Sequence, residues 1–174
     1  FASNDSKQKF KKFLGSLHDF PESIMAIGRL DEKSEGVLLL TTDGKMSAHI
    51  NSRKVEKEYY AQVDGDISIE ALQQLKTGVE IGFDGGKYKT KPCKAFKLEE
   101  IPDLPNRGKK IRDDRHGPTS WVSITLNEGK FRQVRKMTSS VGFPTLRLVR
   151  VRVGSIHIND MQAGDVVEVG VFGV

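Results

Sequence analysis

Segments with strand-like patterns outnumber helical segments in this chain, and the two kinds do not alternate regularly. Residues 37–40 form a short apolar run between two glycines, and residues 120–126 and 146–153 alternate in the manner of strands. A fold built from βαβ units would instead place a helix between successive strands. We therefore predict an α+β fold with a central mixed, mostly antiparallel sheet and flanking helices and loops. Further strands are expected at residues 58–63, 94–98 and 166–169.

Three helices are predicted from capping residues and from the spacing of apolar residues. The clearest covers residues 68–77, where Ile69, Leu72 and Leu75 fall at three-residue steps and Gly78 can end the helix. A short helix should follow the capping residue Asp43, because an aspartate side chain can accept hydrogen bonds from a first helical turn. A third helix is expected over residues 131–141, and residues 101–118 are expected to form a loop.

Positive charge is concentrated in the second half of the chain. The net charge is +5 and the pI is about 9.3. Such an excess attracts polyanions and supplies the salt-dependent part of nucleic-acid binding. A solvated basic face, an acidic membrane surface or an anionic metabolite would also account for charge alone. Between residues 103 and 152, four acids oppose twelve basic residues: Arg107, Lys109, Lys110, Arg112, Arg115, Lys130, Arg132, Arg135, Lys136, Arg147, Arg150 and Arg152.

The residue types available narrow the chemistry. Four histidines are scattered without metal-ligand spacing, a single cysteine cannot build a zinc site, and no phosphate-binding glycine loop is present in the sequence. We therefore expect no metal and no nucleotide cofactor. Carboxylates, tyrosines and arginines remain, and these suit acid–base or nucleophilic catalysis without a cofactor.

Cellular location is constrained by Cys93 and by the apolar runs. A lone cysteine forms no internal disulfide, which favours a reducing compartment, so we expect a cytoplasmic protein. No apolar run approaches the roughly 20 residues that cross a bilayer, and we expect no membrane association. We also expect a monomer.

Two motifs carry the strongest functional signal. Residues 28–44 begin with Gly28-Arg29-Leu30-Asp31, and residues 128–137 read Glu-Gly-Lys-Phe-Arg-Gln-Val-Arg-Lys-Met. Taken separately, the aspartate would be a turn residue and the second motif a solvated basic helix. Together, about a hundred residues apart and with Lys57-Glu58-Tyr59 between them, they resemble one family of pseudouridine synthases. That family includes the A-type enzyme for small-subunit rRNA and the B-, E- and F-type enzymes for large-subunit rRNA. Residues 111–121 and 142–148 look most similar to its E-type branch.

The resemblance implies a pseudouridine synthase fold and a role for each matching residue. Asp31 would be the catalytic carboxylate that drives cleavage of the uridine N-glycosidic bond. Tyr59 would stack on the target base and is a candidate for proton transfer. Arg135 would pair with the carboxylate, and Leu148 would form the apolar wall of the uracil pocket. Arg29 stands where relatives have a basic residue near the flipped nucleotide.

A uridine in large-subunit (23S) ribosomal RNA is the substrate that the resemblance implies. The basic residues around the motifs would then bind this RNA. For Lys57 a solvated position is an equal alternative, and for Arg147 and Arg150 a solvated strand face is the alternative. The expected RNA-binding residues are Arg29, Lys57, Lys130, Arg132, Gln133, Lys136, Arg147 and Arg150.

Elementary chemistry agrees with these roles. Cleavage of a glycosidic bond builds positive charge on the sugar, which a carboxylate stabilises or captures. A nearby guanidinium keeps that carboxylate ionised against the effect of burial. Flipping a base out of folded RNA costs a few kcal/mol, and aromatic stacking of about 1–3 kcal/mol per base offsets much of this.

The resemblance also bears on domain organisation and on alternatives. Relatives usually begin with a strand that contains a Lys-Pro-x-Gly motif, and this sequence starts just beyond its expected position. We expect a single catalytic domain over residues 1–174, without that strand and without a separate RNA-binding domain. A non-catalytic RNA-binding or ribosome-assembly module, or a synthase with a different RNA target, remains an alternative. Trp121 and Met137 are expected in the core.

Overall fold

A six-stranded sheet forms the centre of the molecule. The computed structural model describes residues 12–52, 54–83, 85–107, 111, 114–170 and 172. All pairings in this sheet are antiparallel except that of β2 with β9, so the predicted mixed, mostly antiparallel α+β fold is confirmed. Its strands, in spatial order, are β10 (Ile156–His157), β9 (Thr145–Val153), β4 (Lys57–Asp64), β8 (Thr119–Leu126) and β7 (Lys94–Lys97), with β2 (Glu35–Gly36) beside β9.

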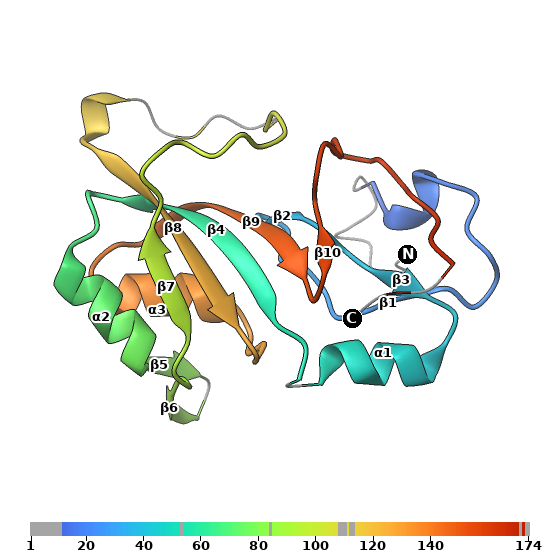
Figure 1. Ribbon diagram of the computed structural model, residues 1–174, viewed down its shortest axis with the longest axis horizontal. Helices are drawn as coiled ribbons and strands as arrows, with labels where there is room; N and C mark the ends of the chain where they lie inside the picture. The colour runs from blue at the N-terminus through green and yellow to red at the C-terminus, as the bar shows by residue number, and fades with distance from the viewer. Residues whose placement is uncertain are drawn as a thin grey trace.

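Helices cover one face of this sheet, and a smaller lobe lies at its end (Figure 1). The helices α2 (Ile69–Thr77) and α3 (Gln133–Ser140) pack on the sheet through Ala71, Leu75, Val134 and Met137. The hairpin of β5 (Glu80–Phe83) and β6 (Gly86–Lys89) continues this layer. The smaller lobe contains β1 (Met25–Ala26), paired with β3 (Leu40–Thr41), and the helix α1 (Gly44–Asn51). Two short 3-10 helices complete the described elements, η2 (Leu14–Ser16) and η3 (Asp114–His116).

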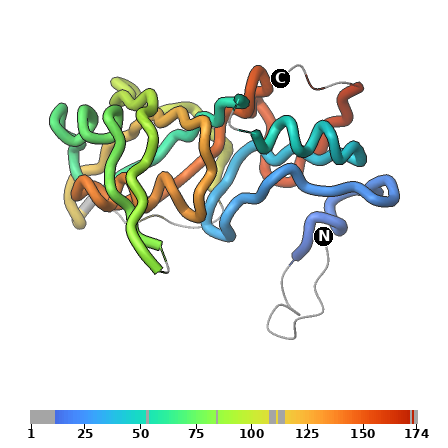
Figure 2. The backbone as a smooth tube through the Cα atoms, turned by 90° about the horizontal axis from the view of Figure 1, so that it is seen from below, coloured from blue at the N-terminus to red at the C-terminus, as the bar shows by residue number. Residues whose placement is uncertain are grey.

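The smaller lobe has its own apolar cluster. Ile27, Val37, Leu39 and Ile50 pack there with Val153 from the end of β9. Figure 2 shows the C-terminal segment running beside α1 and the early part of the chain. Residues from both ends of the sequence therefore build the wall next to the central sheet.

The predicted caps are confirmed. The Asp43 carboxylate accepts a hydrogen bond of 2.7 Å from Lys45 N, and the Ser68 hydroxyl accepts one of 3.2 Å from Ala71 N. Gly78 ends α2 with φ +95°, and a Cβ there would lie 2.2 Å from the carbonyl oxygen of Thr90. The spacing of apolar residues predicts burial correctly for Leu75 but not for Ile69, which lies in the first turn of α2 and is 81% exposed.

Three sequence-based boundaries are wrong. Residues 37–39 are not part of a continuous strand, because the parallel pairing of β2 with β9 ends at Gly36, next to a hydrogen bond of 2.9 Å from Val37 N to Arg150 O, and the next strand begins only at Leu40. Residues 166–169 form no strand; Val166, Val167 and Val169 are exposed and pair with no strand among the described residues. The third helix begins only at Gln133, because the preceding Arg132 has left-handed backbone angles of φ 52° and ψ 33°.

Alternation along the central strands separates two faces. Lys57 and Tyr59 of β4 share one face with Leu126 of β8 and with Leu148 and Arg150 of β9, as the pairing register places them. The intervening residues of β4 face the other way, where Glu58 binds Arg152 at 2.8 Å. The main core lies on the first face and includes Met137, which is 0% exposed. Trp121, opposite Gln62 on the other face, is 8% exposed, so the predicted burial of both residues is confirmed.

Candidate active site

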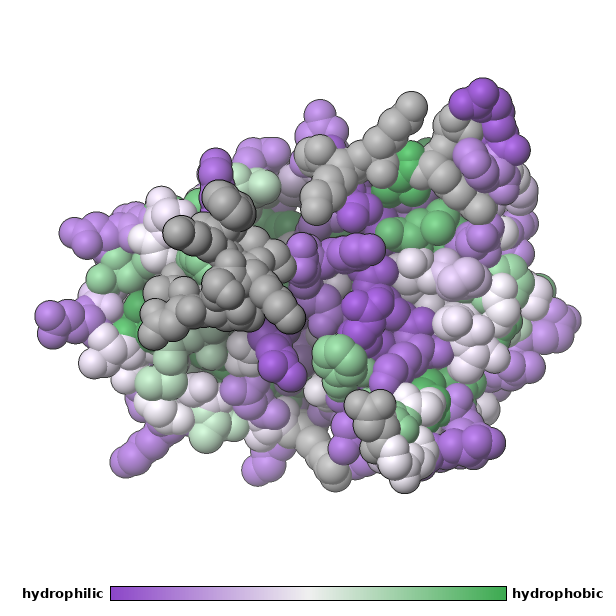
Figure 3. Space-filling view, turned by 180° about the vertical axis from the view of Figure 1, so that it is seen from behind, coloured by the Kyte–Doolittle hydropathy of each residue, from purple (hydrophilic) through white to green (hydrophobic). Residues whose placement is uncertain are grey.

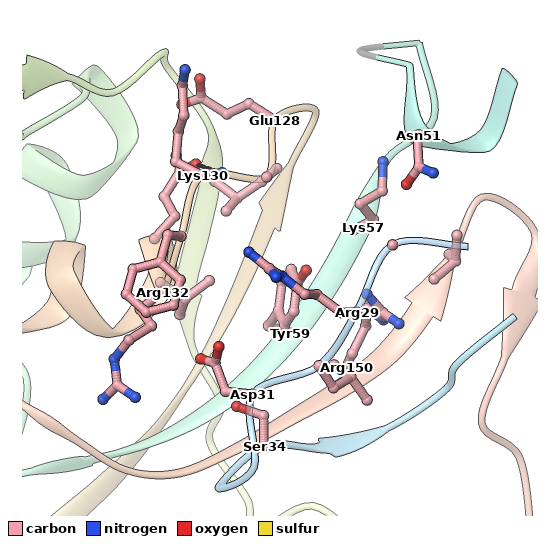
Figure 4. A pocket seen from close by; sticks show the side chains of 18 of the residues that line it. Arg29, Asp31, Ser34, Asn51, Lys57, Tyr59, Glu128, Lys130, Arg132 and Arg150 are labelled. Carbon is pink, nitrogen blue, oxygen red and sulfur yellow. Dashed lines mark hydrogen bonds between the residues drawn. The ribbon is translucent and has the colours of Figure 1, made fainter. Parts of the chain in front are cut away.

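A cavity of about 260 Å³ opens where the smaller lobe meets the first face of the sheet. Its floor is the uncovered end of that face, including Tyr59, Leu126 and Leu148. In Figure 4, Tyr59 and Arg29 point into this space between Asp31 and Lys57. Nine of the twelve residues expected at the site line it: Arg29, Asp31, Lys57, Tyr59, Lys130, Arg132, Gln133, Leu148 and Arg150.

The loop that carries Asp31 is positioned by β2. This strand pairs in parallel with β9, with Gly36 opposite Arg150, and β9 pairs with β4, where Tyr59 is opposite Arg150. Gly36 has φ +110°, and a Cβ there would lie 2.2 Å from Arg150 O, so only glycine fits. Ser34 N donates to Asp31 O at 2.8 Å and closes the turn. Two successive strand pairings, β2 with β9 and β9 with β4, therefore bring the turn of Asp31 to the cavity that Tyr59 also lines.

Arg135 holds the same loop from helix α3. Its Nη2 donates to the carbonyl oxygen of Lys33 at 2.8 Å and to Ser34 Oγ at 3.4 Å, and its Nη1 donates to Thr145 O at 3.3 Å. Burial lowers the pKa of Arg135, while the nearby charge of Asp31 raises it. The two charges therefore interact, but within the described chain no direct hydrogen bond or ion pair joins the side chains. Arg135 does not line the cavity among the described residues; it supports the loop from behind.

Lys57 and Arg150 are buried cations at the far end of the floor. Lys57 is 9% exposed and donates to Ile50 O at 3.0 Å and Val55 O at 3.1 Å. Burial lowers the pKa of Lys57, and the charge of Arg150 lowers it further. Arg150 is 5% exposed, and its Nε donates to Val37 O at 2.7 Å. The alternative of a solvated side chain therefore does not hold for either residue. Both donate hydrogen bonds to backbone carbonyl groups of the smaller lobe or the segments that lead into it.

The opposite rim of the cavity is the turn of residues 128–133, which side-chain hydrogen bonds hold in place. Gln133 Oε1 accepts from Lys130 N at 2.9 Å, and Gln133 Nε2 donates to Glu128 Oε1 at 2.6 Å. Glu128 is 6% exposed and also accepts from Tyr88 Oη at 2.6 Å and from Lys91 N at 2.9 Å. Gln133 was expected to bind RNA; in the structure its side chain is 3% exposed, and its amide holds the turn.

Two expected RNA-binding residues lie away from the cavity. Arg147 donates to both carboxylate oxygens of Glu35 at 3.1 Å and to Pro105 O at 2.6 Å. Its contact with RNA stays a prediction that the geometry does not favour, because Glu35 and Pro105 hold the guanidinium and the side chain is only 12% exposed. Lys136 donates to Gly82 O at 2.7 Å and lies 3.8 Å from the centre of the Phe83 ring. Arg152, on the other face, is held by Glu58 and Glu56.

Several residues that line the cavity were not among the expected site residues, although Ser34, Glu128 and Phe131 lie within the two motifs. Leu126 faces the cavity only because β8 pairs in register with β4, with Leu126 opposite Lys57. Ser34 and Asn51 come from a turn and from the end of α1. Glu128 and Phe131 belong to the second motif, whose buried network and exposed ring follow from the turn geometry.

The family follows from comparison of the chain with known proteins. The family model described as RNA pseudouridylate synthase matches residues 2–140. The chain belongs to this family. It is 42% identical over 146 residues to ribosomal large subunit pseudouridine synthase E of Xanthomonas campestris, covering 83% of this chain and 76% of that protein. The protein of the same name from Vibrio parahaemolyticus is 41% identical, over 82% of this chain and 59% of its own length.

The fold agrees with that assignment. A crystal structure of a pseudouridylate synthase superposes with a TM-score of 0.68 at 26% identity, covering 87% of this chain and 59% of that protein. The resemblance seen in the two motifs is thereby confirmed at the level of the family and of the fold. Among the described residues, no helix is long and apolar enough to cross a membrane, and no cluster of three metal-binding side chains occurs.

Proposed function

We propose that this chain isomerises a specific uridine of large-subunit (23S) ribosomal RNA to pseudouridine, with Asp31 as the catalytic carboxylate. The observation that carries the proposal is the cavity itself, which combines Asp31, the Tyr59 ring and the apolar walls Leu126 and Leu148. A cavity that joins an aromatic ring and apolar walls to a carboxylate suits a pyrimidine whose sugar lies near that carboxylate. The names of the relatives supply the RNA class.

The reaction requires no outside reactant. The N1–C1′ bond of the uridine breaks, the uracil turns within the cavity, a C5–C1′ bond forms, and the C5 proton is transferred to N1 through a base or solvent. Charge that develops on the sugar during cleavage is stabilised by the Asp31 carboxylate, whether that carboxylate attacks C1′ or removes a proton from C2′. Tyr59 would stack on the uracil and is the candidate for proton transfer.

Positioning of Asp31 depends on Arg135. A guanidinium that holds both Lys33 O and Ser34 Oγ restricts the turn in which Asp31 lies. Correct orientation of the reacting groups contributes a large part of enzymatic rate enhancement. A fixed loop should therefore give a faster reaction than a flexible one.

RNA would approach over the charged rim. Arg29, Lys130 and Arg132 line the cavity from both sides, and a band of hydrophilic side chains crosses the middle of the face shown in Figure 3. Such charges supply affinity without sequence preference. We propose large-subunit rRNA as the partner, the cytoplasm as the location and a monomer as the active form, with no cofactor.

Replacement of Asp31 by Asn tests the proposal. Pseudouridine would be mapped across ribosomal RNA from cells that lack this protein and from the same cells supplied with wild type, Asp31→Asn or Asp66→Asn. Asp66 is an exposed carboxylate paired with Lys97, away from the cavity, and serves as the matched control. We expect one large-subunit site to lose pseudouridine, wild type and Asp66→Asn to restore it, and Asp31→Asn to bind RNA within severalfold of wild type without restoring it.

The alternatives predict different results. Full restoration by Asp31→Asn would remove the catalytic role of this carboxylate. A lost site in small-subunit or transfer RNA would correct the substrate, and no lost site, together with an assembly defect that Asp31→Asn repairs, would support a non-catalytic RNA-binding module.

A further inference from the structure

Phe131 is an exposed aromatic residue at the rim of the cavity. It lines the cavity and is 58% exposed, in contrast to the buried aliphatic residues on the floor. An aromatic ring left in water beside a binding site has unsatisfied apolar surface that a flat ligand can cover. The isomerisation chemistry assigned to Asp31 and Tyr59 makes no use of it.

The turn that carries Phe131 is held rigidly. Glu128 and Gln133, on either side of it in sequence, are joined by a hydrogen bond of 2.6 Å, and Glu128 is tied to the β5–β6 hairpin through Tyr88. The next residue, Arg132, adopts φ 52°, a left-handed conformation that is unfavourable for a residue with a side chain and concentrates at functional sites. The backbone of the turn that carries Phe131 is therefore held in place at both ends.

A cation supports the ring. Lys136 Nζ lies 5.5 Å from the centre of the Phe131 ring and 3.8 Å from that of Phe83. Both distances fall within the range of cation–π attraction. Lys136 thus lies near the ring, which is still 58% exposed, and a nucleobase can cover that exposed surface by stacking.

The neighbours of Phe131 indicate the class of ligand. Lys130 and Arg132 flank it in sequence, and both line the same cavity. Basic side chains interleaved with an exposed aromatic residue are the usual surface for single-stranded nucleic acid, since charges follow the phosphates and the ring stacks on a base. The core of a protein–protein interface is usually a larger apolar patch with few charged residues, so these neighbours favour a nucleic acid over a protein partner.

We propose that Phe131 is a stacking residue for an unpaired base adjacent to the target uridine. The uridine would enter the cavity against Tyr59, while its neighbour in the RNA would lie on the Phe131 ring at the rim. Two aromatic contacts would then select RNA in which the target and one flanking base are both unstacked. The inference rests on RNA being the substrate, as proposed above, but not on Asp31 being the catalytic group.

The test compares binding of two short RNA probes of equal length. The first is oligouridine with a single 2-aminopurine, whose fluorescence is quenched on stacking; the second has the same backbone with abasic sites in place of all bases. Phe131→Leu keeps apolar volume but removes the ring, and Phe131→Trp keeps a ring. Phe96, on β7 and on the opposite face of the sheet, is 50% exposed and provides the control Phe96→Leu.

We expect Phe131→Leu to bind the oligouridine probe roughly tenfold more weakly and to lose most of the quenching. The same variant should bind the abasic probe with wild-type affinity, because the phosphate contacts remain. Phe131→Trp and Phe96→Leu should behave as wild type on both probes, and all variants should share its melting temperature, since both rings are mainly exposed.

Unchanged affinity and quenching in Phe131→Leu would overturn the proposal. So would an equal loss on both probes, which would indicate a role in arranging charges or in docking a protein. If Phe131→Leu melts at a lower temperature, Phe131→Trp decides: weak binding by that well-folded variant would also count against stacking. Binding is read without turnover, so an active Asp31→Asn variant would refute the catalytic assignment and leave this result intact.

Discussion

Arg135 Nη2 donates a hydrogen bond of 2.8 Å to the carbonyl oxygen of Lys33, a residue 102 positions earlier in the chain and two residues after Asp31. The two motifs that are so far apart in sequence are therefore joined directly in space. Helix α3 contributes a positioning side chain to the first motif and, through Arg132 at its start, a cation to the rim of the cavity. The connection explains why a basic helix and a glycine-flanked aspartate belong to one site.

Replacement of Arg135 by Lys should preserve charge but lose the geometry. A lysine presents a single nitrogen, which cannot bridge Lys33 O and Thr145 O as the guanidinium does. We expect kcat for pseudouridine formation to fall roughly hundredfold, with RNA affinity changed only severalfold. Arg152→Lys, on the opposite face of the sheet, should leave kcat unchanged. Equal rates for Arg135→Lys and wild type in a single-turnover assay would show that the loop of Asp31 keeps its position without the guanidinium of Arg135.

Gly36→Ala should unfold more easily and lose activity. The added Cβ would lie 2.2 Å from Arg150 O at a φ of +110°, so the β2–β9 pairing must move. Overpacking and left-handed strain together should lower the free energy of unfolding by about 3 kcal/mol, measured by urea denaturation. Gly82→Ala, where nothing lies within 4 Å of the added Cβ, is the control and should change stability by no more than about 1 kcal/mol. A Gly36→Ala protein as stable as this control would contradict the close approach.

Tyr59→Phe should separate stacking from proton transfer. The ring remains, so binding of oligouridine should stay within severalfold of wild type. If the hydroxyl transfers the proton, kcat should fall roughly 10²- to 10⁴-fold. Tyr60→Phe, the next residue of β4 and on the opposite face, should retain full activity. Wild-type kcat in Tyr59→Phe would restrict Tyr59 to stacking.

The salt dependence of RNA binding should distinguish rim residues from internal ones. Removal of Arg132, which is exposed at the rim, should shallow the slope of log affinity against log salt by about 0.7. Arg147→Ala should leave the slope unchanged, because its guanidinium is bound to Glu35. It should instead lower the free energy of unfolding by about 2 kcal/mol, as a charged hydrogen-bond pair is lost. A shallower slope for Arg147→Ala would restore the sequence-based expectation that this residue binds RNA.

Glu128 should make the stability of the protein depend on pH in the acid range. Burial opposes ionisation of this carboxylate, but hydrogen bonds from Tyr88, Lys91 N and Gln133 outweigh burial and leave its pKa below the ordinary 4.5. Its contribution to stability is therefore complete above the unfolded-state pKa and is lost as pH falls through the lower folded-state pKa. The difference in unfolding free energy between wild type and Glu128→Gln should be largest near neutral pH and shrink under acid conditions.

Urea denaturation at several pH values measures this difference. Glu99→Gln, an exposed carboxylate in a loop, serves as the control and should follow wild type throughout. If the difference in unfolding free energy between wild type and Glu128→Gln is the same at neutral and acid pH, the negative charge of Glu128 does not contribute to stability.

The sequence determined the local elements and the identity of the central residues. The caps at Asp43 and Ser68 and the positive φ of Gly78 follow from interactions within a few residues, and the strand at β4 follows from its residue pattern; these predictions are confirmed. The two motifs were sufficient to indicate the family. They also placed Asp31, Tyr59 and Leu148 among the site residues, and all three line the cavity.

Tertiary structure decided which side chains face the cavity and which are used elsewhere. Arg147 and Arg150 are three residues apart on one basic strand, yet the first is bound to Glu35 and the second is buried against Val37 O. The alternation of the strand puts them on opposite faces, but the partner that each meets is set by the register of a neighbouring strand far away in sequence. The close approach of Gly36 to Arg150 O depends on the same long-range pairing. A pattern within one segment carries no information about which distant segment will pack against it, so the site could be assembled only from the folded chain.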